Sequence, residues 1–352
     1  MKSGWCSILL TGAVAVLCAQ VCSAPSVVLR DAPELKFPSQ ADSNSPVEWD
    51  GNTMYLFNSI GIVVRSQGSD LFNISKTVQV KFNNQINAGR WIECTRRADD
   101  GTLYGWYHCE PLGMFKGNTL TSPYIGAARS TDNGATWTDL GTVLEGPKDT
   151  IDPNARNGYF VGGNGDFSSM LDAKGKYLYL FFSTYAGDIS EQGISVARME
   201  WANRDKPAGQ VWKYHKGSWK EAGIGGHISP VFTAKARWQD AKNDAFWGPS
   251  IHWNTHLKRY VMLLNHVKGG PGWPQEGIYF TYCRTLDDPR AWSQPKPVLT
   301  SAQAPVSWYP EVIGTDTKAR ETDKLCGQRG RLFIQGVSHH EIIFLKDGEK
   351  IE

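Results

Sequence analysis

The segment Ser130–Trp137 constrains the fold of this chain more than any other part of the sequence. It reads S-T-D-N-G-A-T-W, in which Asp132 can accept hydrogen bonds from turn amides and Gly134 can adopt a positive φ. Thr136 and Trp137 follow, and β-branched and aromatic residues of this kind pack well in strands. The segment therefore predicts the tip of a β-hairpin.

The rest of the sequence also has the pattern of β structure. Short runs rich in Val, Ile, Tyr, Phe and Trp alternate with Gly, Asp, Asn and Pro turns, and no long helical period follows residue 24. The 36 Gly, 14 Trp, 13 Tyr and 14 Phe suit many tight turns between closely packed sheets. The runs group into five units, near 42–89, 90–146, 160–222, 227–300 and 307–346.

The pattern of Ser130–Trp137 resembles the Asp-box of β-propellers, and Leu286–Ser293 looks like a divergent equivalent in the fourth unit. A single clean copy favours few blades. We therefore predict an all-β fold, a five-bladed β-propeller with one Asp-box, with a two-sheet sandwich as the alternative. The propeller is expected to span 42–346, after an arm over 25–41 and before a charged tail over 347–352.

The N-terminus has the pattern of a signal peptide. Lys2 precedes the apolar run Ile8–Cys18, and Cys22–Ala24 offers small residues for cleavage after Ala24. The run is too short to span a membrane. We therefore expect residues 1–24 to be removed and the protein to be secreted or periplasmic, with no membrane attachment after cleavage.

Export would change the chemistry expected of the cysteines. Four remain after the signal, and an even number in an oxidising compartment favours disulfides. Cys94 and Cys109 flank an apparent hairpin, which favours a bridge between them and leaves Cys283 with Cys326, although four cysteines allow three pairings. No Cys-x-x-Cys or Cys/His spacing predicts a metal site. The net charge of +2 gives no reason to expect nucleic acid as a partner.

Carboxylates stand where four of the five units begin. In a propeller the innermost strand of each blade faces the central axis, and its entry residues line one mouth. Asp42, Glu93, Asp166 and Glu311 occupy the first, second, third and fifth entries, and Trp247 occupies the fourth. Neighbouring carboxylates raise one another's pKa, so such a ring indicates pairing or function.

These entries resemble those of the five-bladed propeller glycosidases, the arabinanase-, invertase- and levansucrase-like group, in particular secreted bacterial members. The resemblance rests on the Asp-rich first entry, Gly165–Ser168 and Phe246–Trp253. It implies a glycoside hydrolase in which Asp42 is the nucleophile or base and Asp166 holds the sugar. Some relatives hold a structural Ca²⁺ on the axis, but no ligand run predicts one here, and we expect no cofactor.

The resemblance leaves the general acid open among Glu93, Glu110, Glu276 and Glu311. Hydrolysis needs two carboxyl groups of different pKa on either side of the glycosidic bond. The predicted catalytic residues are Asp42, Asp166, Glu93 and Glu276; the predicted substrate-binding residues are His108, Glu110, Trp247, His252, Trp308 and Glu311. Each also has a structural interpretation, such as a turn cap, a salt bridge or packing between blades.

Two other functions remain open. A sialidase-like enzyme would need three arginines around a substrate carboxylate and a Tyr nucleophile, and Arg65, Arg129, Arg156 and Arg198 are available. A propeller that binds glycans or a protein without catalysis is the other alternative, because the fold hosts both activities. The sequence favours a monomer that acts on carbohydrate.

Overall fold

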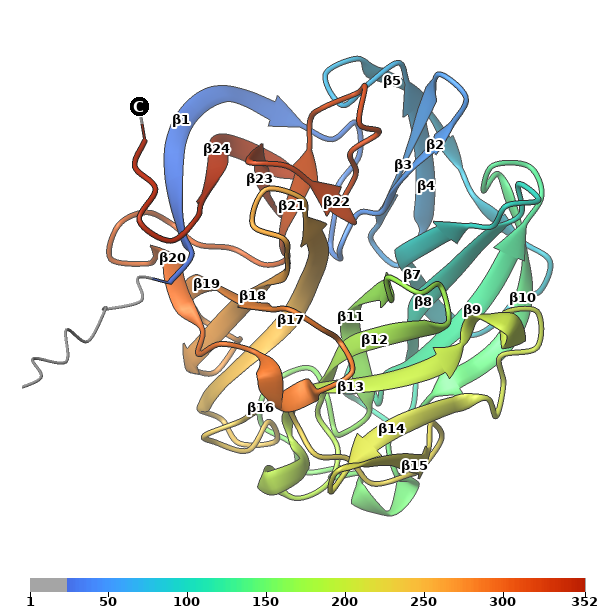
Figure 1. Ribbon diagram of the computed structural model, residues 1–352. Coiled ribbons are helices and arrows are strands. Elements are labelled where there is room, and N and C mark those ends of the chain that lie inside the picture. Colours follow the sequence, from blue (N-terminus) through green and yellow to red (C-terminus); the bar gives the residue numbers. More distant parts are fainter. Residues whose placement is uncertain (1–23, 352) are drawn as a thin grey trace, which may run out of the picture.

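The computed structural model describes residues 24–351 and contains five β-sheets arranged around a common axis (Figure 1). The prediction of an all-β, five-bladed β-propeller is confirmed. Most of the predicted signal peptide, residues 1–23, lies outside the described residues. Within residues 24–351, no helix combines the length and the apolar character that crossing a membrane requires.

The blades follow one another along the chain. The first contains β2 (Val47–Asp50), β3 (Thr53–Ser59), β4 (Val63–Gly68) and β5 (Ile74–Gln79). The second contains β7 (Ala88–Arg97), β8 (Leu103–Pro111), β9 (Tyr124–Ser130) and β10 (Thr136–Leu144), with β6 (Lys81–Phe82) beside β10. The third contains β11 (Asn164–Leu171), β12 (Tyr177–Thr184), β13 (Gly193–Glu200), β14 (Val211–His215) and β15 (Ser218–Ala222), with β16 (Phe232–Thr233) beside β13.

The last two blades complete the ring. The fourth contains β17 (Asn243–Asn254), β18 (Arg259–Gly269), β19 (Gln275–Cys283) and β20 (Lys296–Thr300), with β22 (Leu325–Cys326) parallel to β17. The fifth contains β21 (Pro310–Gly314), β23 (Arg329–Ile334), β24 (Val337–Leu345) and β1 (Ser26–Lys36). Four short 3₁₀ turns lie in the connections, η1 (Lys148–Thr150), η2 (Ile189–Glu191), η3 (Trp201–Asn203) and η4 (Pro289–Ala291).

The N-terminal strand closes the ring, which differs from the expected arm. β1 runs antiparallel beside β24, with Ser26 opposite Leu345 and Lys36 opposite Val337 (Figure 1). The segment 25–41 therefore includes the outer strand of the fifth blade. The register shifts between Asp31 and Leu35, where Pro33 interrupts the alternation that would mark a strand. Pairing of β1 with β24 joins the two ends of the chain and covers an open sheet edge.

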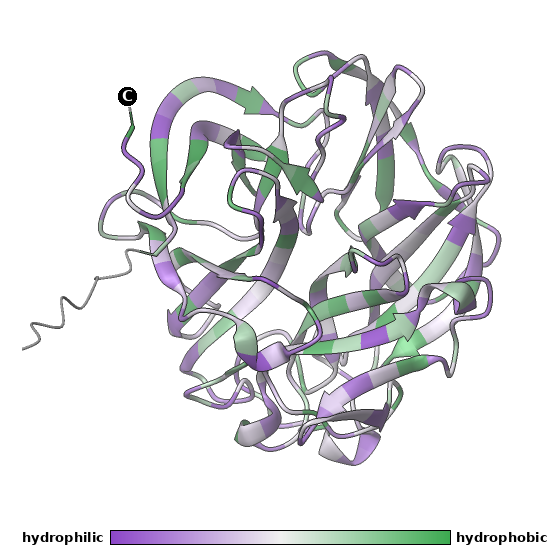
Figure 2. Cartoon of the chain, in the orientation of Figure 1, coloured by the Kyte–Doolittle hydropathy of each residue, from purple (hydrophilic) through white to green (hydrophobic). Residues whose placement is uncertain are grey.

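The hydrophobic core lies between the blades, because successive side chains of a strand point to opposite faces of its sheet. On β12, Leu178 and Phe182 pack toward the second blade, whereas Tyr179 and Phe181 pack toward the fourth. Strand segments in Figure 2 accordingly carry much of the hydrophobic colour, and many connecting loops are hydrophilic. Each large apolar side chain buried in this way contributes roughly 1.5–3 kcal/mol.

The Ser130–Trp137 segment forms the hairpin between β9 and β10, at the outside of the second blade. Asp132 accepts from the Thr136 N–H at 2.9 Å and from the Thr136 hydroxyl at 2.7 Å. The Gly134 N–H donates to Ser130 Oγ, and Gly134 has φ +79°. Burial acts to raise the pKa of Asp132, but its hydrogen bonds with Thr136 and Ser130 outweigh burial and lower it. The hairpin is a structural unit, as its sequence predicts.

Replacing Asp132 is expected to weaken the fold without affecting the axis. Asp132→Ala removes the acceptor for two donors of Thr136, so the free energy of unfolding should fall by about 1–2 kcal/mol. Urea unfolding measures this loss. Asp149→Ala, on an exposed residue of η1, is the matched control. Equal midpoints for both variants would show that these bonds do not stabilise the blade.

The predicted disulfides do not form. All four cysteines of the described chain are free and buried. Cys94 lies opposite Trp106 and faces the core between the second and third blades, whereas Cys109 lies opposite Arg90 and faces the core between the first and second blades. Cys283 and Cys326 likewise belong to different inter-blade cores. Each expected pair is therefore separated by its own sheet.

Candidate active site

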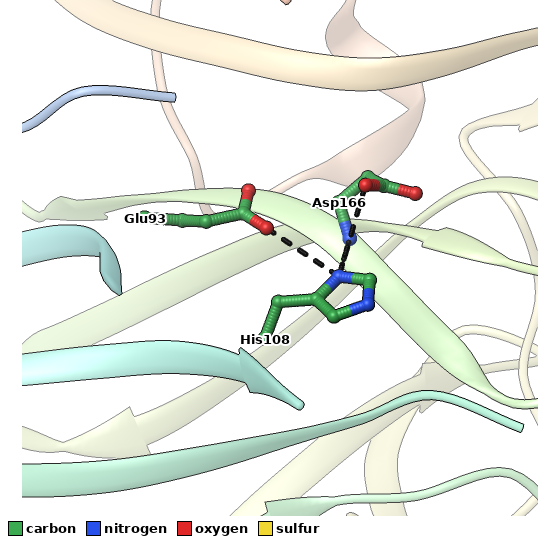
Figure 3. A group of neighbouring side chains, drawn as sticks. All are labelled: Glu93, His108 and Asp166. Atoms are coloured by element: carbon green, nitrogen blue, oxygen red, sulfur yellow. Dashed lines mark hydrogen bonds and ion pairs between the residues drawn. The ribbon is translucent and has the colours of Figure 1, made fainter. Parts of the chain in front are cut away.

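Three of the predicted residues come together on the axis. Glu93 lies on β7, His108 on β8 and Asp166 near the start of β11, and each offers an atom within 4.8 Å of the others (Figure 3). All three are buried. Asp42, which precedes β2, and Glu110, at the end of β8, interact electrostatically with this group. The second strand of the second blade thus supplies two of the five polar groups.

Asp166 is held in one position by two tyrosines. The Tyr309 hydroxyl donates to its Oδ1 at 2.8 Å, and the Tyr185 hydroxyl donates to its Oδ2. Its backbone has φ +43°, a region that costs free energy for a residue with a side chain and is common at functional sites. Burial raises the pKa of Asp166, although His108 and both tyrosines act in the opposite direction.

Glu93 lies beneath Asp166 and contacts the same imidazole. Its Oε2 accepts from the Phe167 N–H at 2.8 Å, and its Oε1 lies 3.4 Å from His108 Nδ1. Burial raises the pKa of Glu93 to about 7, against the opposing effect of the neighbouring His108 ring. The Glu93 carboxyl is closed off from solvent.

His108 connects the buried group to the mouth. The Asp166 N–H donates to Nδ1 at 2.9 Å, and Nε2 lies 3.2 Å from Glu110 Oε1. Burial lowers the pKa of His108, but Glu110 and Glu93 outweigh burial and raise it, while the amide at Nδ1 opposes a second ring proton. Nε2 lies closest to Glu110, but it is buried without a hydrogen-bond partner among the described residues. Gly165 permits this contact, since a Cβ there would lie 2.4 Å from His108 Cε1.

Asp42 and Glu110 are the carboxyl groups closest to solvent. Asp42 is half-buried, and the side chain of Glu110 is 30% exposed. Burial raises the pKa of Asp42 to about 7, with further contributions from Asp166 and Glu110. Glu110 instead lies 3.2 Å from His108 Nε2. The two groups therefore lie in different electrostatic environments.

Aromatic rings surround this mouth. The rings of Tyr159 and Trp308 are half-buried and lie 5.8 Å apart. Burial, with a further contribution from Asp42, raises the pKa of Tyr159. Trp273 and Phe160 pack beneath Tyr159. Half-exposed rings of this kind suit stacking on a sugar ring. Trp308, predicted to bind substrate, is thus placed beside the acidic group.

Trp247 and His252 lie deeper than predicted for residues that bind substrate. Trp247 is fully buried, and its Nε1 donates to Gln275 at 3.1 Å. His252 lies on β17 against Phe344, and burial lowers its pKa to about 3. Trp247 packs beneath the mouth, against Trp308 and Tyr309, whereas His252 points into the packing between blades.

Glu276 lies outside the cluster. It begins β19, the third strand of the fourth blade, where it accepts from Tyr279 at 2.7 Å and contacts His266 Nδ1 at 3.0 Å. His266 also contacts Asp244 at 3.2 Å. Glu276 therefore lies near the start of the third strand of its blade, and the structure does not bring it to Asp42 or Asp166.

Glu311 lies on the axis, but it is fully enclosed. It stands on β21, and its Oε2 accepts from the Ser45 N–H at 2.9 Å. Its Oε1 is buried without a hydrogen-bond partner among the described residues. Burial raises the pKa of Glu311 well above its usual range, and the charges of Asp323 and Glu93 act in the same direction.

Glu311→Gln is expected to change how stability depends on pH. Folded Glu311 keeps its proton at pH values where the unfolded chain loses it, so stability falls as pH rises above about 4.5. The variant lacks this loss. Its free energy of unfolding, relative to that of the wild type, should therefore increase by up to about 1.4 kcal/mol per pH unit. Urea unfolding at pH 5 and pH 8 measures the gain, with Glu34→Gln at an exposed site as control. Parallel pH dependences for variant and wild type would contradict this account.

Hydrogen bonds within the protein engage several of the atoms of the Glu93–His108–Asp166 group that could bind a metal ion. Two backbone N–H groups, those of Asp166 and Phe167, point at His108 Nδ1 and Glu93 Oε2 and occupy their lone pairs. A cation at this point would face amide protons. Both carboxyl oxygens of Asp166 accept from tyrosine hydroxyls. The contacts of this group within the described chain are hydrogen bonds and a close carboxyl–imidazole pair.

No family model and no curated protein matches the chain. Among solved structures, a Bifidobacterium bifidum protein assigned as an exo-β-1,3-galactanase has a TM-score of 0.51 at 12% identity, covering 89% of this chain and 90% of its own. An exo-β-1,3-galactanase from Phanerochaete chrysosporium, crystallised with β-1,3-galactotriose, has a TM-score of 0.50 at 13% identity. That match covers 91% of this chain but only 64% of the fungal one. The chain therefore shares the fold of the five-bladed β-propeller glycoside hydrolases, as the sequence resemblance predicts.

Proposed function

We propose that this protein hydrolyses O-glycosidic bonds in a polysaccharide or oligosaccharide. The observation that carries the proposal is the pair Asp42 and Glu110, two interacting carboxyl groups in different environments at one aromatic mouth. Glycoside hydrolysis needs two carboxyl groups of this kind, one protonated and one ionised. The fold shared with glycoside hydrolases adds support.

The different environments of Asp42 and Glu110 decide which of them takes the role of acid and which that of nucleophile or base. Asp42, with a pKa of about 7, holds a proton that it can donate to the leaving oxygen. Glu110, beside the imidazole of His108, is the group to which we assign attack on the anomeric carbon or activation of water. This assignment reverses the role of Asp42 that the sequence resemblance implies. Its physical reason is the burial of Asp42 beside two other carboxyl groups.

Asp166 acts on both members of the pair. Its charge contributes to raising the pKa of Asp42, and its backbone N–H fixes the ring of His108. The two tyrosines that hold its carboxyl oxygens keep this charge in place. Asp166 therefore has a positioning and electrostatic role in the proposed reaction, and Tyr159 and Trp308 form the surface on which the sugar ring stacks.

The substrate class follows from the chemistry of the mouth and from the structural relatives. The proposed substrate is a carbohydrate, and β-1,3-linked galactan is the first candidate, because both reported relatives are described as acting on it. The predicted signal sequence supports action outside the cytoplasm after cleavage. We further propose that the protein acts as a monomer. The sialidase alternative has less support, since Arg65 donates to Asp132 and Asn133, Arg129 pairs with Asp205, and Arg198 lies over Tyr177 and Trp219.

A glycan panel tests the proposal. Wild type and Asp166→Asn are incubated with galactans, arabinans, fructans and sialylated oligosaccharides, and release of reducing sugar is measured. We expect wild type to cleave at least one neutral glycan and the variant to be slower by roughly 10²-fold or more. If wild type cleaves nothing yet binds sugars as well as the variant does, the protein is a glycan-binding propeller.

A further inference from the structure

A second cavity lies at the other end of the axis. It has a volume of about 610 Å³, within the usual range for small-molecule sites, and it forms where the inner strands of the first four blades end. Leu171 lines it and comes five residues after Asp166 on β11, so the two ends are roughly 16 Å apart along the strand. Other lining residues are Trp49, Arg96, Arg97, Trp253, Tyr260 and Arg320.

The cavity contains guanidinium groups with unused hydrogen-bond donors. The half-buried Arg96 side chain has no hydrogen-bond or ion-pair partner within residues 24–351. Arg97 donates to the carbonyl oxygens of Trp49 and Gly101, but its Nη2 is buried without a partner in the described chain. A buried donor without a partner costs free energy that a ligand oxygen can recover.

The acidic residues of the cavity are already paired. Glu48 lies 3.2 Å from Lys324 Nζ, which also contacts Asp323 at 2.7 Å. Asp172 accepts from the N–H groups of Lys176 and Tyr177 in its own turn. These carboxylates therefore already have partners within the protein. The groups of the cavity that remain free to bind a ligand are the positively charged guanidinium groups. A planar guanidinium matches a carboxylate in geometry, with two parallel N–H···O bonds.

Aromatic faces stand beside these donors. Trp253 and Tyr260 pack at 4.8 Å, and Trp49 lies beneath the guanidinium of Arg320 at 4.5 Å. The rings of Trp49 and Trp253 are half-buried, so part of each can contact a ligand. A ligand that satisfies both features has an apolar ring face and a carboxylate. A uronic acid residue has both, whereas inorganic phosphate would leave the aromatic faces unused.

We propose that this cavity is a binding site for an acidic saccharide, a uronic acid residue at the end of an oligosaccharide or in its chain. Arg96 and Arg97 bind its carboxylate, and Trp253 or Trp49 lies against its sugar ring. The site is separate from the mouth, so its occupancy does not depend on the proposed hydrolysis. It would hold the protein on an acidic glycan while the mouth remains open to a neutral one.

Calorimetric titration of the full mature chain with trigalacturonic acid tests the proposal, with β-1,3-galactotriose as the neutral probe. We expect wild type to bind the acidic trimer at one site, more weakly as salt rises, and Arg96→Met to weaken it at least tenfold, about 1.4 kcal/mol. Trp253→Ala should weaken it as well. Arg284→Met, at an exposed arginine outside the cavity, should bind like wild type.

Other results would overturn the proposal. These are no binding by wild type, equal binding of the neutral trimer at this site, or an Arg96→Met variant as strong as Arg284→Met. Asp42→Asn distinguishes binding at the mouth from binding at the cavity, because it changes the mouth and leaves the cavity intact. If Asp42→Asn abolishes binding of the acidic trimer while Arg96→Met does not, the trimer binds at the mouth. Binding at the cavity with no hydrolysis of any glycan would leave this site in place and remove only the proposed function.

Discussion

Asp42→Asn should lower kcat by about 10³-fold on glycans with poor leaving groups and by far less on activated aryl glycosides. The amide cannot donate the proton that Asp42 supplies to the leaving oxygen, and loss of a general acid typically costs 10²–10⁴-fold. A good leaving group departs without that proton. Rates on a series of aryl glycosides of increasing leaving-group acidity measure the difference between variant and wild type.

Asp149→Asn, an isosteric change at an exposed site in η1, controls for general effects of an added amide. Circular dichroism and the unfolding midpoint should match wild type in both variants. An equal loss on all leaving groups in Asp42→Asn would contradict the role of Asp42 as the acid. It would instead indicate the role of base or nucleophile that the resemblance implies.

Glu110→Gln is expected to remove activity on every substrate, by roughly 10³-fold or more, whatever the leaving group. The variant keeps a polar group near His108 Nε2 but lacks the charge that attacks the anomeric carbon or activates water. Azide should restore part of the activity on activated substrates, because a small anion can occupy the space of the missing carboxylate. Product analysis identifies the glycosyl azide and its configuration.

Glu276→Gln is the matched control for this experiment, because it makes the same change at a carboxylate that pairs with His266 and Tyr279 on β19. We expect its kcat/KM to equal that of wild type. Normal activity in Glu110→Gln together with lost activity in Glu276→Gln would move the catalytic group to the fourth blade. Failure of azide to restore any activity, with a selective loss on poor leaving groups, would make Glu110 the acid.

Local sequence patterns predicted most of the fold. The alternation of apolar residues and the turn residues between them placed the five blades, because both depend on neighbours along the chain. β1 was missed as a blade strand because its partner, β24, is about three hundred residues away and Pro33 interrupts its alternation. The prediction of two disulfides was wrong for a related reason. Proximity of Cys94 and Cys109 along a hairpin does not reveal which face of the sheet each occupies.

The candidate site was predicted in part. Asp42, Glu93, His108, Glu110 and Asp166 were all selected from sequence, and the structure groups them on the axis. The two tyrosines that hold Asp166 were not predicted, because Tyr185 follows β12 and Tyr309 comes from the fifth blade. The burial that raises the pKa of Asp42 also depends on distant residues. The only local signal was the Gly-rich run before Asp166.

The pH dependence of kcat/KM tests the central claim most directly, because it reports ionisations of the free enzyme. If Asp42 is the acid, its protonated form is active, and its raised pKa predicts that kcat/KM falls as pH rises through about 7. Asp42→Asn should lack this descending limb on activated substrates. A wild-type kcat/KM that instead rises through pH 7, with the rise lost in Asp42→Asn, would contradict the account and make Asp42 the base.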